Sequence, residues 1–276
     1  MLVILRGAGD LATGIIYRLY KSGFKILALE TEKPSAIRRT VSFSECIYTS
    51  KQMVEDVIAK KVTNLEEIKK CWQNREVPVI IDPRGEYIGI LKPKIVIDAI
   101  IAKKNYGTNK NMAPITIALG PGFIAGKDVN VVIETMRGHN LGKLIFKGEA
   151  LANTGEPGKI EGITKERVIY SEVRGVFKAV KKIGDSVKKN DILGFVDDTP
   201  VYSKINGLLR GIISDGYFVQ NSFKIADIDP RLNQYKNCFT ISDKARSLGG
   251  AVLEAILSEL QKEGGKNGFK YFGEDF

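Results

Sequence analysis

Short apolar runs alternate with amphipathic stretches over the first half of the chain. Residues 2–6 form the first run, and an amphipathic stretch from Asp10 to Lys21 follows it after a glycine-rich turn. Further apolar runs of strand length occupy residues 25–30, 78–82, 95–98 and 115–119. Apolar strands separated by helical stretches are typical of a parallel sheet with helices on its faces. We therefore predict an α/β chain that begins with a Rossmann-like parallel sheet.

Beyond about residue 125 the pattern changes to short strands punctuated by glycines. An internal repeat is present there, because residues 175–197 match residues 207–229 at one constant offset, with glycines in corresponding places. A strand, a glycine turn and a second strand, occurring twice, predict two interlocked halves related by a pseudo-twofold axis. This all-β arrangement resembles the barrel-sandwich hybrid of biotinyl and lipoyl carrier domains.

The connection between the two halves differs from that of a carrier domain. A carrier presents a modifiable lysine at the tip of a hairpin, whereas residues 198–203 here form a shorter connection with Pro200 near that position. Lys204 lies too close to Gly207 of the second half to be at the tip. We therefore expect no attached biotin or lipoate, and we interpret the module as a docking or structural domain.

The end of the chain returns to a helical pattern. Ser242 is expected to cap an amphipathic helix from Asp243 to Leu260, and the glycines at 249–250 predict close approach to another backbone or to a ligand. The predicted division is a Rossmann-like nucleotide-binding domain at 1–125, a β domain at 126–238 with the hybrid at about 172–230, a final helix at 239–262 that packs back on the first domain, and a flexible tail at 263–276.

The turn after the first strand carries the main candidate binding site. Its spacing of Gly7, Gly9 and Ala12 matches the dinucleotide fingerprint, in which glycines allow a tight turn and close approach of a phosphate to the backbone. Glu30 ends the next strand, where a ribose-binding carboxylate is expected. Asp10 either caps the helix or competes with a phosphate for the same N–H groups. The predicted cofactor-binding residues are Gly7, Gly9, Asp10, Leu11, Ala12, Glu30, Gly120, Gly122 and Asn140.

Other polar residues follow the later strands of the predicted sheet. Asp82, Asp98 and the turn at 120–122 come directly after apolar runs, at the edge where parallel sheets bind ligands. Arg137 and His139 are the candidate catalytic residues, because a turn bounded by glycines could aim them at an anion or a carbonyl group. A solvated hairpin turn is the alternative. His139 is the only histidine, so we expect no histidine-based metal site.

Residues 33–40 are expected to form a short helix that carries Arg38 and Arg39. These guanidinium groups either approach the 2′-phosphate of a nucleotide or lie at a solvated helix end. The pattern favours the solvated end.

Composition narrows the classes of partner. The chain has 276 residues and a net charge of +10, with its lysines interleaved with acids along the whole length. Since no nucleic-acid-binding motif accompanies them, we expect an anionic small-molecule ligand and no nucleic acid. Cys46, Cys71 and Cys238 are far apart, which fits a reducing compartment and not a disulfide framework or zinc site. No apolar run reaches the about 18 residues of a membrane span, and a signal-peptide pattern is absent, so we expect a cytoplasmic protein without a membrane partner.

Seven motifs together resemble one family over residues 2 to about 257, which is nearly the whole chain. They are GAGDLATG (7–14), EKP (32–34), RRTVSF (38–43), LGPGF (119–123), ET with RGHNLG (134–142), NTGEPG (153–158) and ISDKA (241–245). They are similar to the YqeB-type accessory proteins of bacterial selenium-dependent molybdenum hydroxylases. The resemblance implies a role in assembling a hydroxylase of the xanthine or purine dehydrogenase kind, with a hydroxylase subunit or cofactor-assembly proteins as partners. No cysteine lies in these motifs, which argues against a dedicated selenium-handling thiol.

Three functions are compatible with these residues. The first is a maturation factor that binds a nucleotide or molybdopterin cofactor at the glycine loop, with Arg137 and His139 gripping the rest of the ligand. The second is an NAD(P)-dependent oxidoreductase, with Glu30 on the ribose and His139 as general acid or base. The third is a non-enzymatic docking scaffold. Whether the chain is an enzyme, and whether it forms a homo-oligomer, stays open at this point.

Overall fold

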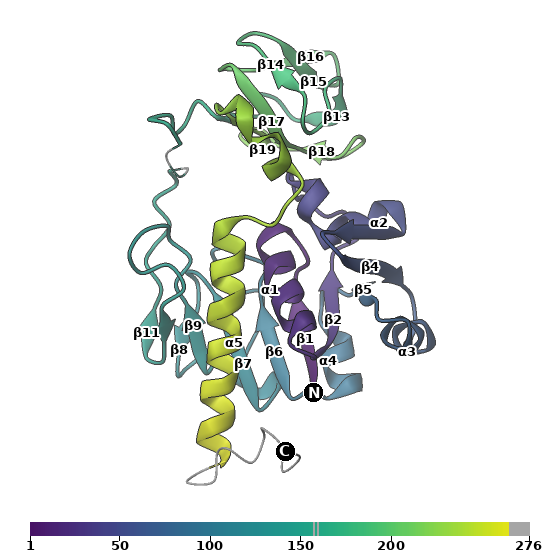
Figure 1. The fold of residues 1–276 in the computed structure, drawn as a ribbon, viewed down its shortest axis with the longest axis vertical. Helices are drawn as coiled ribbons and strands as arrows, with labels where there is room; N and C mark the ends of the chain where they lie inside the picture. Colours follow the sequence, from purple (N-terminus) through teal and green to yellow (C-terminus); the bar gives the residue numbers. More distant parts are fainter. Residues whose placement is uncertain (157, 159, 265–276) are drawn as a thin grey trace.

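The computed structural model describes residues 1–156, 158 and 160–264. A nine-stranded sheet with helices on its faces forms one end of the molecule, and two four-stranded sheets form the other (Figure 1). The last helix, α5 (Asp243–Gly264), starts between the two parts and runs along the nine-stranded sheet. The part that contains the two smaller sheets, residues 167–229, is called the C-terminal module below.

The nine-stranded sheet has the strand order β10-β9-β7-β6-β1-β2-β5-β4-β3. The strands between the two edges pair in parallel with their neighbours, and β1 and β7 are buried almost throughout. Burial of this kind is typical of strands covered on both faces. In spatial order the strands span Leu144–Ile145, Val131–Ile133, Ile115–Leu119, Ile95–Asp98, Leu2–Arg6, Lys25–Glu30, Val77–Ile81, Val57–Val62 and Lys51–Val54.

The two edge strands make this sheet mixed, so the predicted Rossmann-like parallel sheet is wrong. β3 pairs antiparallel with β4, and β10 pairs antiparallel with β9. Short connections are the reason: only Glu55 and Asp56 join β3 to β4, and residues 134–143 join β9 to β10, whereas a parallel crossover needs about a dozen residues or more. The sheet takes β9 and β10 from beyond the predicted boundary at residue 125; the division into domains itself stays a prediction.

Helices pack on both faces of the sheet. α1 (Asp10–Lys21) and α5 share a core with Val3 and Leu5, while α3 (Leu65–Gln73) and α4 (Glu86–Leu91) share a second core with Ile4. Neighbouring side chains of β1 therefore point to opposite faces, which is the period of a strand. The remaining short elements are α2 (Cys46–Thr49), β8 (Ile124–Ala125), β11 (Gly148–Glu149), and the 3₁₀ turns η1 (Arg39–Val41), η2 (Phe43–Glu45), η3 (Lys110–Met112) and η4 (Leu232–Cys238).

Helices α1 and α5 approach each other closely through glycines. A Cβ atom added to Gly14 would lie 2.6 Å from the carbonyl oxygen of Ala245, and one added to Gly249 would lie 2.7 Å from that of Gly14. The close approach that the paired glycines predict is thus confirmed for Gly249, and its partner is helix α1. Gly250 differs, since a Cβ atom there would meet nothing within 4 Å.

The start of α5 is capped as predicted. The Ser242 hydroxyl accepts a hydrogen bond from the N–H of Ala245 at 3.2 Å. The predicted flexible tail lies almost entirely outside the described residues, which end at 264. Among the residues that are described, no helix has both the length and the apolar character needed to cross a membrane.

The internal repeat corresponds to two halves of the C-terminal module that exchange short strands. In the first half, β13 pairs with β15; in the second, β17 pairs with β19. The short strand β14 of the first half joins β17, and the short strand β18 of the second half joins β13, so the predicted interlocking is present. The strands are β12 (Val168–Tyr170), β13 (Gly175–Ala179), β14 (Ser186–Val187), β15 (Ile192–Val196), β16 (Thr199–Tyr202), β17 (Gly207–Ile212), β18 (Phe218–Val219) and β19 (Lys224–Asp229).

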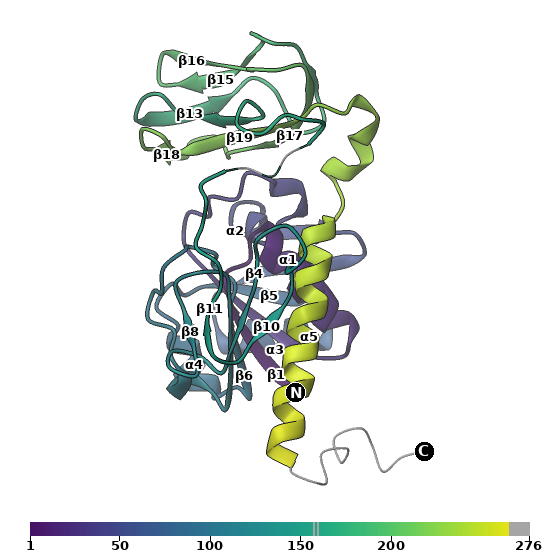
Figure 2. The same ribbon diagram turned by 90° about the vertical axis from the view of Figure 1, so that its left-hand side faces the viewer.

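These strands form two separate antiparallel sheets, with the orders β12-β19-β17-β14 and β16-β15-β13-β18 (Figure 2). Each sheet ends in two edge strands, and the two-residue strands β14 and β18 are too short to close it. The predicted fold class is therefore corrected. The chain is α/β with a large mixed sheet, two four-stranded antiparallel sheets and one final helix, in place of a Rossmann-like parallel sheet with a barrel-sandwich hybrid.

The glycines of α5 allow a stability test with a matched control. We expect Gly249→Ala to lower the free energy of unfolding by about 1–3 kcal/mol, because its Cβ atom would push α1 away. Gly250→Ala should raise it by about 0.5–1 kcal/mol, since alanine favours a helix where space is free. Urea unfolding of both variants measures the difference. Equal effects of the two substitutions would contradict the helix contact.

Candidate functional site

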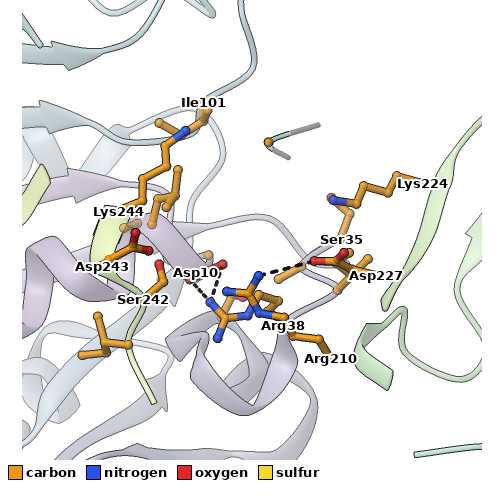
Figure 3. A pocket seen from close by; sticks show the side chains of 18 of the residues that line it. Asp10, Ser35, Arg38, Ile101, Arg210, Lys224, Asp227, Ser242, Asp243 and Lys244 are labelled. Atoms are coloured by element: carbon orange, nitrogen blue, oxygen red, sulfur yellow. Dashed lines mark hydrogen bonds and ion pairs between the residues drawn. The ribbon is translucent and has the colours of Figure 1, made fainter. Parts of the chain in front are cut away.

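A cavity of about 930 Å³ lies between the nine-stranded sheet and the C-terminal module. The wall on the sheet side contains the glycine loop at 7–12 and the segments 34–38 and 99–101, which follow β1, β2 and β6. The opposite wall contains charged residues of β17 and β19, and the start of α5 closes one side (Figure 3). The carboxyl ends of the parallel strands therefore face this cavity, as is usual for ligand sites of such sheets.

The two glycines of the loop have different structural roles. Gly7 has φ +99°, and a Cβ atom there would lie 3.0 Å from the carbonyl oxygen of Ala99, so the turn requires glycine. Gly9 has φ −68°, and a Cβ atom there would meet nothing within 4 Å. Gly9 is the N-cap residue of α1, and no side chain in the described part of the chain caps this helix. The N–H groups of the first turn are thus available to an anion in the cavity.

Asp10 is paired with Arg38 and does not cap the helix. One guanidinium nitrogen of Arg38 lies 3.2 Å from both carboxylate oxygens. The other donates to the carbonyl oxygens of Asn237 and Thr240, at 3.0 and 3.2 Å. Arg38 is buried. The prediction that it lies at a solvated helix end is therefore wrong, and it is not free to approach a 2′-phosphate. Because its charge is compensated, Asp10 repels an anion at the loop much less than the sequence suggests.

Residues 33–38 are irregular, and the predicted short helix at 33–40 is reduced to the turn η1. One backbone bond and one side-chain bond join this segment and the adjacent Arg39 to the C-terminal module. The N–H of Ile212 in β17 donates to the carbonyl oxygen of Ile37 at 2.8 Å, and Nε of Arg39 donates to the carbonyl oxygen of Ile212 at 2.9 Å. The segment therefore joins the two parts of the molecule.

Glu30 lines the cavity and holds the glycine loop. One carboxylate oxygen accepts the N–H of Ala8 at 2.9 Å, and the other accepts the N–H of Thr31 at 2.8 Å. Burial raises the pKa of Glu30, although both hydrogen bonds act in the opposite direction. Leu11 and Ala12 also line the cavity beside it.

The C-terminal module contributes a basic wall that the sequence analysis missed. Arg167 lies 2.7 Å from a carboxylate oxygen of Asp227, and Arg210 lies 3.8 Å from the other. Lys224 makes no hydrogen bond or ion pair within the described chain. Desolvation lowers the pKa of Lys224, and the positive charges of Arg167 and Arg210 lower it further. Lys224 is exposed, and its side chain extends from β19 toward the cavity (Figure 3). One feature of the sequence could have indicated this wall. Charged residues interrupt two apolar strands, GLLRGI (207–212) and KIADID (224–229).

Of the predicted turn at 137–140, only Arg137 lines the cavity. Its guanidinium group bonds both oxygens of Asp243, at 2.7 and 3.0 Å, and lowers the pKa of that carboxyl to about 2. His139 is exposed and does not line the cavity. Asn140 is also exposed, and its carbonyl oxygen accepts the N–H of Lys143. The structure therefore does not gather these three side chains around one ligand position.

Gly120 and Gly122 follow β7 but do not line the cavity. They have φ +79° and +103°, and added Cβ atoms would lie 2.8 Å from the Thr135 hydroxyl and 2.7 Å from the Cα atom of Lys104. Such contacts show a packing role for both glycines. At these two glycines the connection after β7 packs against Thr135 and Lys104.

Asp82 and Asp98 hold strand ends and are likewise not part of the cavity wall. Asp82 accepts the N–H groups at the start of α4, with distances of 2.8 to 3.0 Å. Asp98 accepts the hydroxyl of Thr108 at 2.6 Å, and Arg6 donates to the same hydroxyl. Burial raises the pKa of Asp98. These contacts place the loop at 99–108 beside the glycine loop.

The three cysteines are buried and outside the cavity wall. Burial raises the pKa of Cys46 to about 12 and raises those of Cys71 and Cys238 as well. A thiol is a nucleophile only as the thiolate. None of the three is therefore suited to act as a nucleophile near neutral pH.

Comparison with known proteins gives one strong sequence match. The chain is 46% identical over 256 residues to the uncharacterized protein YqeB of Escherichia coli (strain K12), covering 93% of this chain and 47% of YqeB. The chain thus spans about half the length of the curated relative that it matches. No protein-family model matches it.

The solved structures that it resembles are distant. A succinylglutamate desuccinylase from Silicibacter sp. TM1040 is 13% identical, with a TM-score of 0.26 over 82% of this chain and 84% of that chain. An aspartoacylase family protein from Mesorhizobium loti is 11% identical, with a TM-score of 0.29 over 83% and 85% of the two chains. These scores are too low to support an argument from either protein.

Replacement of Arg38 tests its role between the two parts. We expect Arg38→Ala to lower the free energy of unfolding by about 3–5 kcal/mol, because it leaves Asp10 and two carbonyl groups without their partner. The exposed Arg174→Ala is the control and should change it by less than about 0.5 kcal/mol. Urea unfolding measures both, and amide exchange of Ile212 should become faster only in Arg38→Ala. Unchanged protection of Ile212 would contradict this role.

The Arg137–Asp243 pair predicts a pH-dependent contribution to stability. The folded pKa of Asp243, about 2, is below an unfolded value of about 3.9. Its contribution is therefore present above about pH 4 and is lost as the pH falls from there toward 2. We expect Asp243→Asn to be less stable than the wild type at pH 7 by less than about 1 kcal/mol, because both side chains are exposed. The difference should vanish near pH 2, and a difference independent of pH in thermal unfolding would exclude this ion pair as its cause.

Proposed function

This chain belongs to the YqeB family, and from that premise we propose that it is an accessory protein in the maturation of a selenium-dependent molybdenum hydroxylase. In this proposal it binds a phosphate-bearing cofactor, either a nucleotide or the molybdopterin cofactor, in the cavity between the nine-stranded sheet and the C-terminal module. The maturation role is what the sequence motifs imply by their resemblance. The binding role is supported by the geometry of the cavity.

The observation that carries the proposal is that an uncapped helix start and a basic wall face the same cavity. The loop at 7–12 offers N–H groups at the start of α1, and Arg210 and Lys224 offer positive charge from the opposite side. Phosphate groups are stabilised by both kinds of partner. The cavity, at about 930 Å³, is large enough for a cofactor of dinucleotide size, since ligand sites span about 300–1,000 Å³.

The cavity also has an apolar portion that suits a ring system. Pro34, Ile37, Ile100, Ile101 and Ile241 contribute to its lining. Ile101 has φ +58°, which is strained for a β-branched residue. Strain of this kind is kept where surrounding contacts impose it, and it is concentrated at binding sites. In this proposal these side chains contact a base or a pterin, and the phosphates lie at the loop.

The residues of the cavity bind and orient, and we assign no reaction to them. Glu30 holds the loop through the N–H of Ala8, and Arg38 neutralises Asp10. The cofactor is cargo in this proposal. A hydroxylase subunit or other cofactor-assembly proteins would receive it, and we place the protein in the cytoplasm with them. Because the chain spans about half of YqeB, the activity and partners of a full-length relative are part of the same proposal.

Calorimetric titration tests the ligand. Wild-type protein is titrated with molybdopterin, its cytosine dinucleotide, CTP, ATP, NAD and NADP. We expect the pterin or its dinucleotide to bind with micromolar affinity. Gly9→Val should weaken this binding by at least about tenfold, since its side chain would occupy the space of the phosphate. A Cβ atom at this position meets no described atom within 4 Å. Gly250→Ala, a substitution at a glycine with equal free space outside the cavity, should bind as the wild type does.

Two other results would redirect the proposal. Selective binding of NAD or NADP would support an oxidoreductase in place of a maturation factor. No binding by any compound of the panel would remove the glycine loop as a functional site and favour a docking scaffold.

A further inference from the structure

We propose that the C-terminal module forms a second anion site in the cavity, made by Lys224 and Arg210 with Arg167, which takes the second phosphoryl group of a diphosphate ligand. This inference rests on the proposed function, because the first phosphoryl group would lie at the glycine loop. It narrows the ligand from any phosphate-bearing cofactor to nucleoside diphosphates and dinucleotides, in which two phosphoryl groups are joined.

The described residues do not balance the charges of this wall. Arg167 and Arg210 both approach Asp227, at 2.7 and 3.8 Å, so one carboxylate serves two guanidinium groups. Lys224 adds a third positive charge with no ion pair in the described chain. Three positive side chains and one negative side chain leave an excess of two positive charges. An excess of that size matches the charge of a phosphoryl group.

Donors in this wall also lack acceptors. Nε of Arg167 and Nε of Arg210 are buried and have no hydrogen-bond partner among the described residues, and the side chain of Arg167 is only 6% exposed. Unpaired buried donors cost free energy, so native proteins keep few of them without a reason. A bound anion would supply the missing acceptors and balance the charge at the same time.

Irregular strand pairing turns these residues toward the cavity. The register of β17 and β19 shifts between Leu209 and Gly211, which leaves Arg210 as the extra residue of a β-bulge. The register of β12 and β19 shifts as well, immediately beside Lys224. Bulges re-aim side chains and are common next to functional sites. One bulge is on β17 and the other is on β19, in the two ladders that β19 forms, and they bring Arg210 and Lys224 to the same wall.

The second site lies across the cavity from the first. Lys224 enters from β19, whereas Lys244 enters from the start of α5 on the opposite side, and the Asp10–Arg38 pair lies between them (Figure 3). Asp10 acts electrostatically on both lysines, while each has its own set of other charged neighbours. A ligand with a single phosphoryl group, bound at the loop, would leave the excess positive charge of the module without a bound anion. In this proposal a diphosphate contacts both walls.

Nucleotides that differ by one phosphoryl group provide the test. Cytidine diphosphate and cytidine monophosphate are titrated into the full chain as wild type, Lys224→Gln, Lys224→Arg and Lys178→Gln. We expect the wild type to prefer the diphosphate by about tenfold or more, as the loss of one charged hydrogen bond implies. Lys224→Gln should remove this preference and change monophosphate binding by less than about twofold.

The controls separate charge from folding. Lys224→Arg keeps the charge and should retain the preference for the diphosphate. Lys178→Gln removes an exposed lysine of the same module, on β13, and should behave as the wild type.

Three results would overturn the second site. One is equal binding of the two nucleotides to the wild type. Another is a diphosphate preference that survives in Lys224→Gln, and the third is absence of binding by both nucleotides. In the first two cases Gly9→Val would still abolish binding if the glycine loop is a phosphate site, so the function proposed above would stand. If neither nucleotide binds, the titrations with molybdopterin and its dinucleotide alone decide the proposed function.

Discussion

The buried guanidinium group of Arg38 is the contact on which the rest of the site depends. It joins Asp10 at the start of α1 to the carbonyl groups of Asn237 and Thr240, which lie between the C-terminal module and α5. The backbone bond between Ile212 and Ile37 adds a second link beside it. A buried ion pair needs close geometry and further hydrogen bonds to offset the loss of water. The two terminal nitrogens of Arg38 have both, and the two walls of the cavity are held facing each other as a result.

The cavity follows from two different ways of positioning charge. On the sheet side, the ends of parallel strands bring the glycine loop and the segments after β2 and β6 to one edge. On the module side, a bulge in β17 and a bulge in β19 place Arg210 and Lys224 where a regular ladder would not. The first arrangement offers backbone N–H groups and the second offers whole positive charges. A ligand that needs both must lie between the two parts.

The elements with strong local patterns were predictable from the sequence. The apolar runs marked the central strands, Ser242 marked the start of α5, and the repeat marked the exchange of β14 and β18. The parallel sheet was a wrong prediction, because apolar strands have the same pattern in parallel and mixed sheets. Only the short connections at 55–56 and 134–143 decide the direction of the edge strands. Long-range contacts also decided the predicted turn at 137–140, since Arg137 lines the cavity whereas His139 is exposed and does not line it.

The sequence by itself determined the loop, its glycines and the membership of a family, because these depend on local backbone geometry and on motifs close together in the chain. The tertiary structure decided what faces the loop. Arg38, Arg167, Arg210 and Lys224 are far apart in the sequence and carry no shared spacing. Their meeting depends on the docking of the module and on the register of β19, and both are long-range properties. The sequence does not show which residues contact a charged side chain in a strand, because these contacts form only when the chain folds.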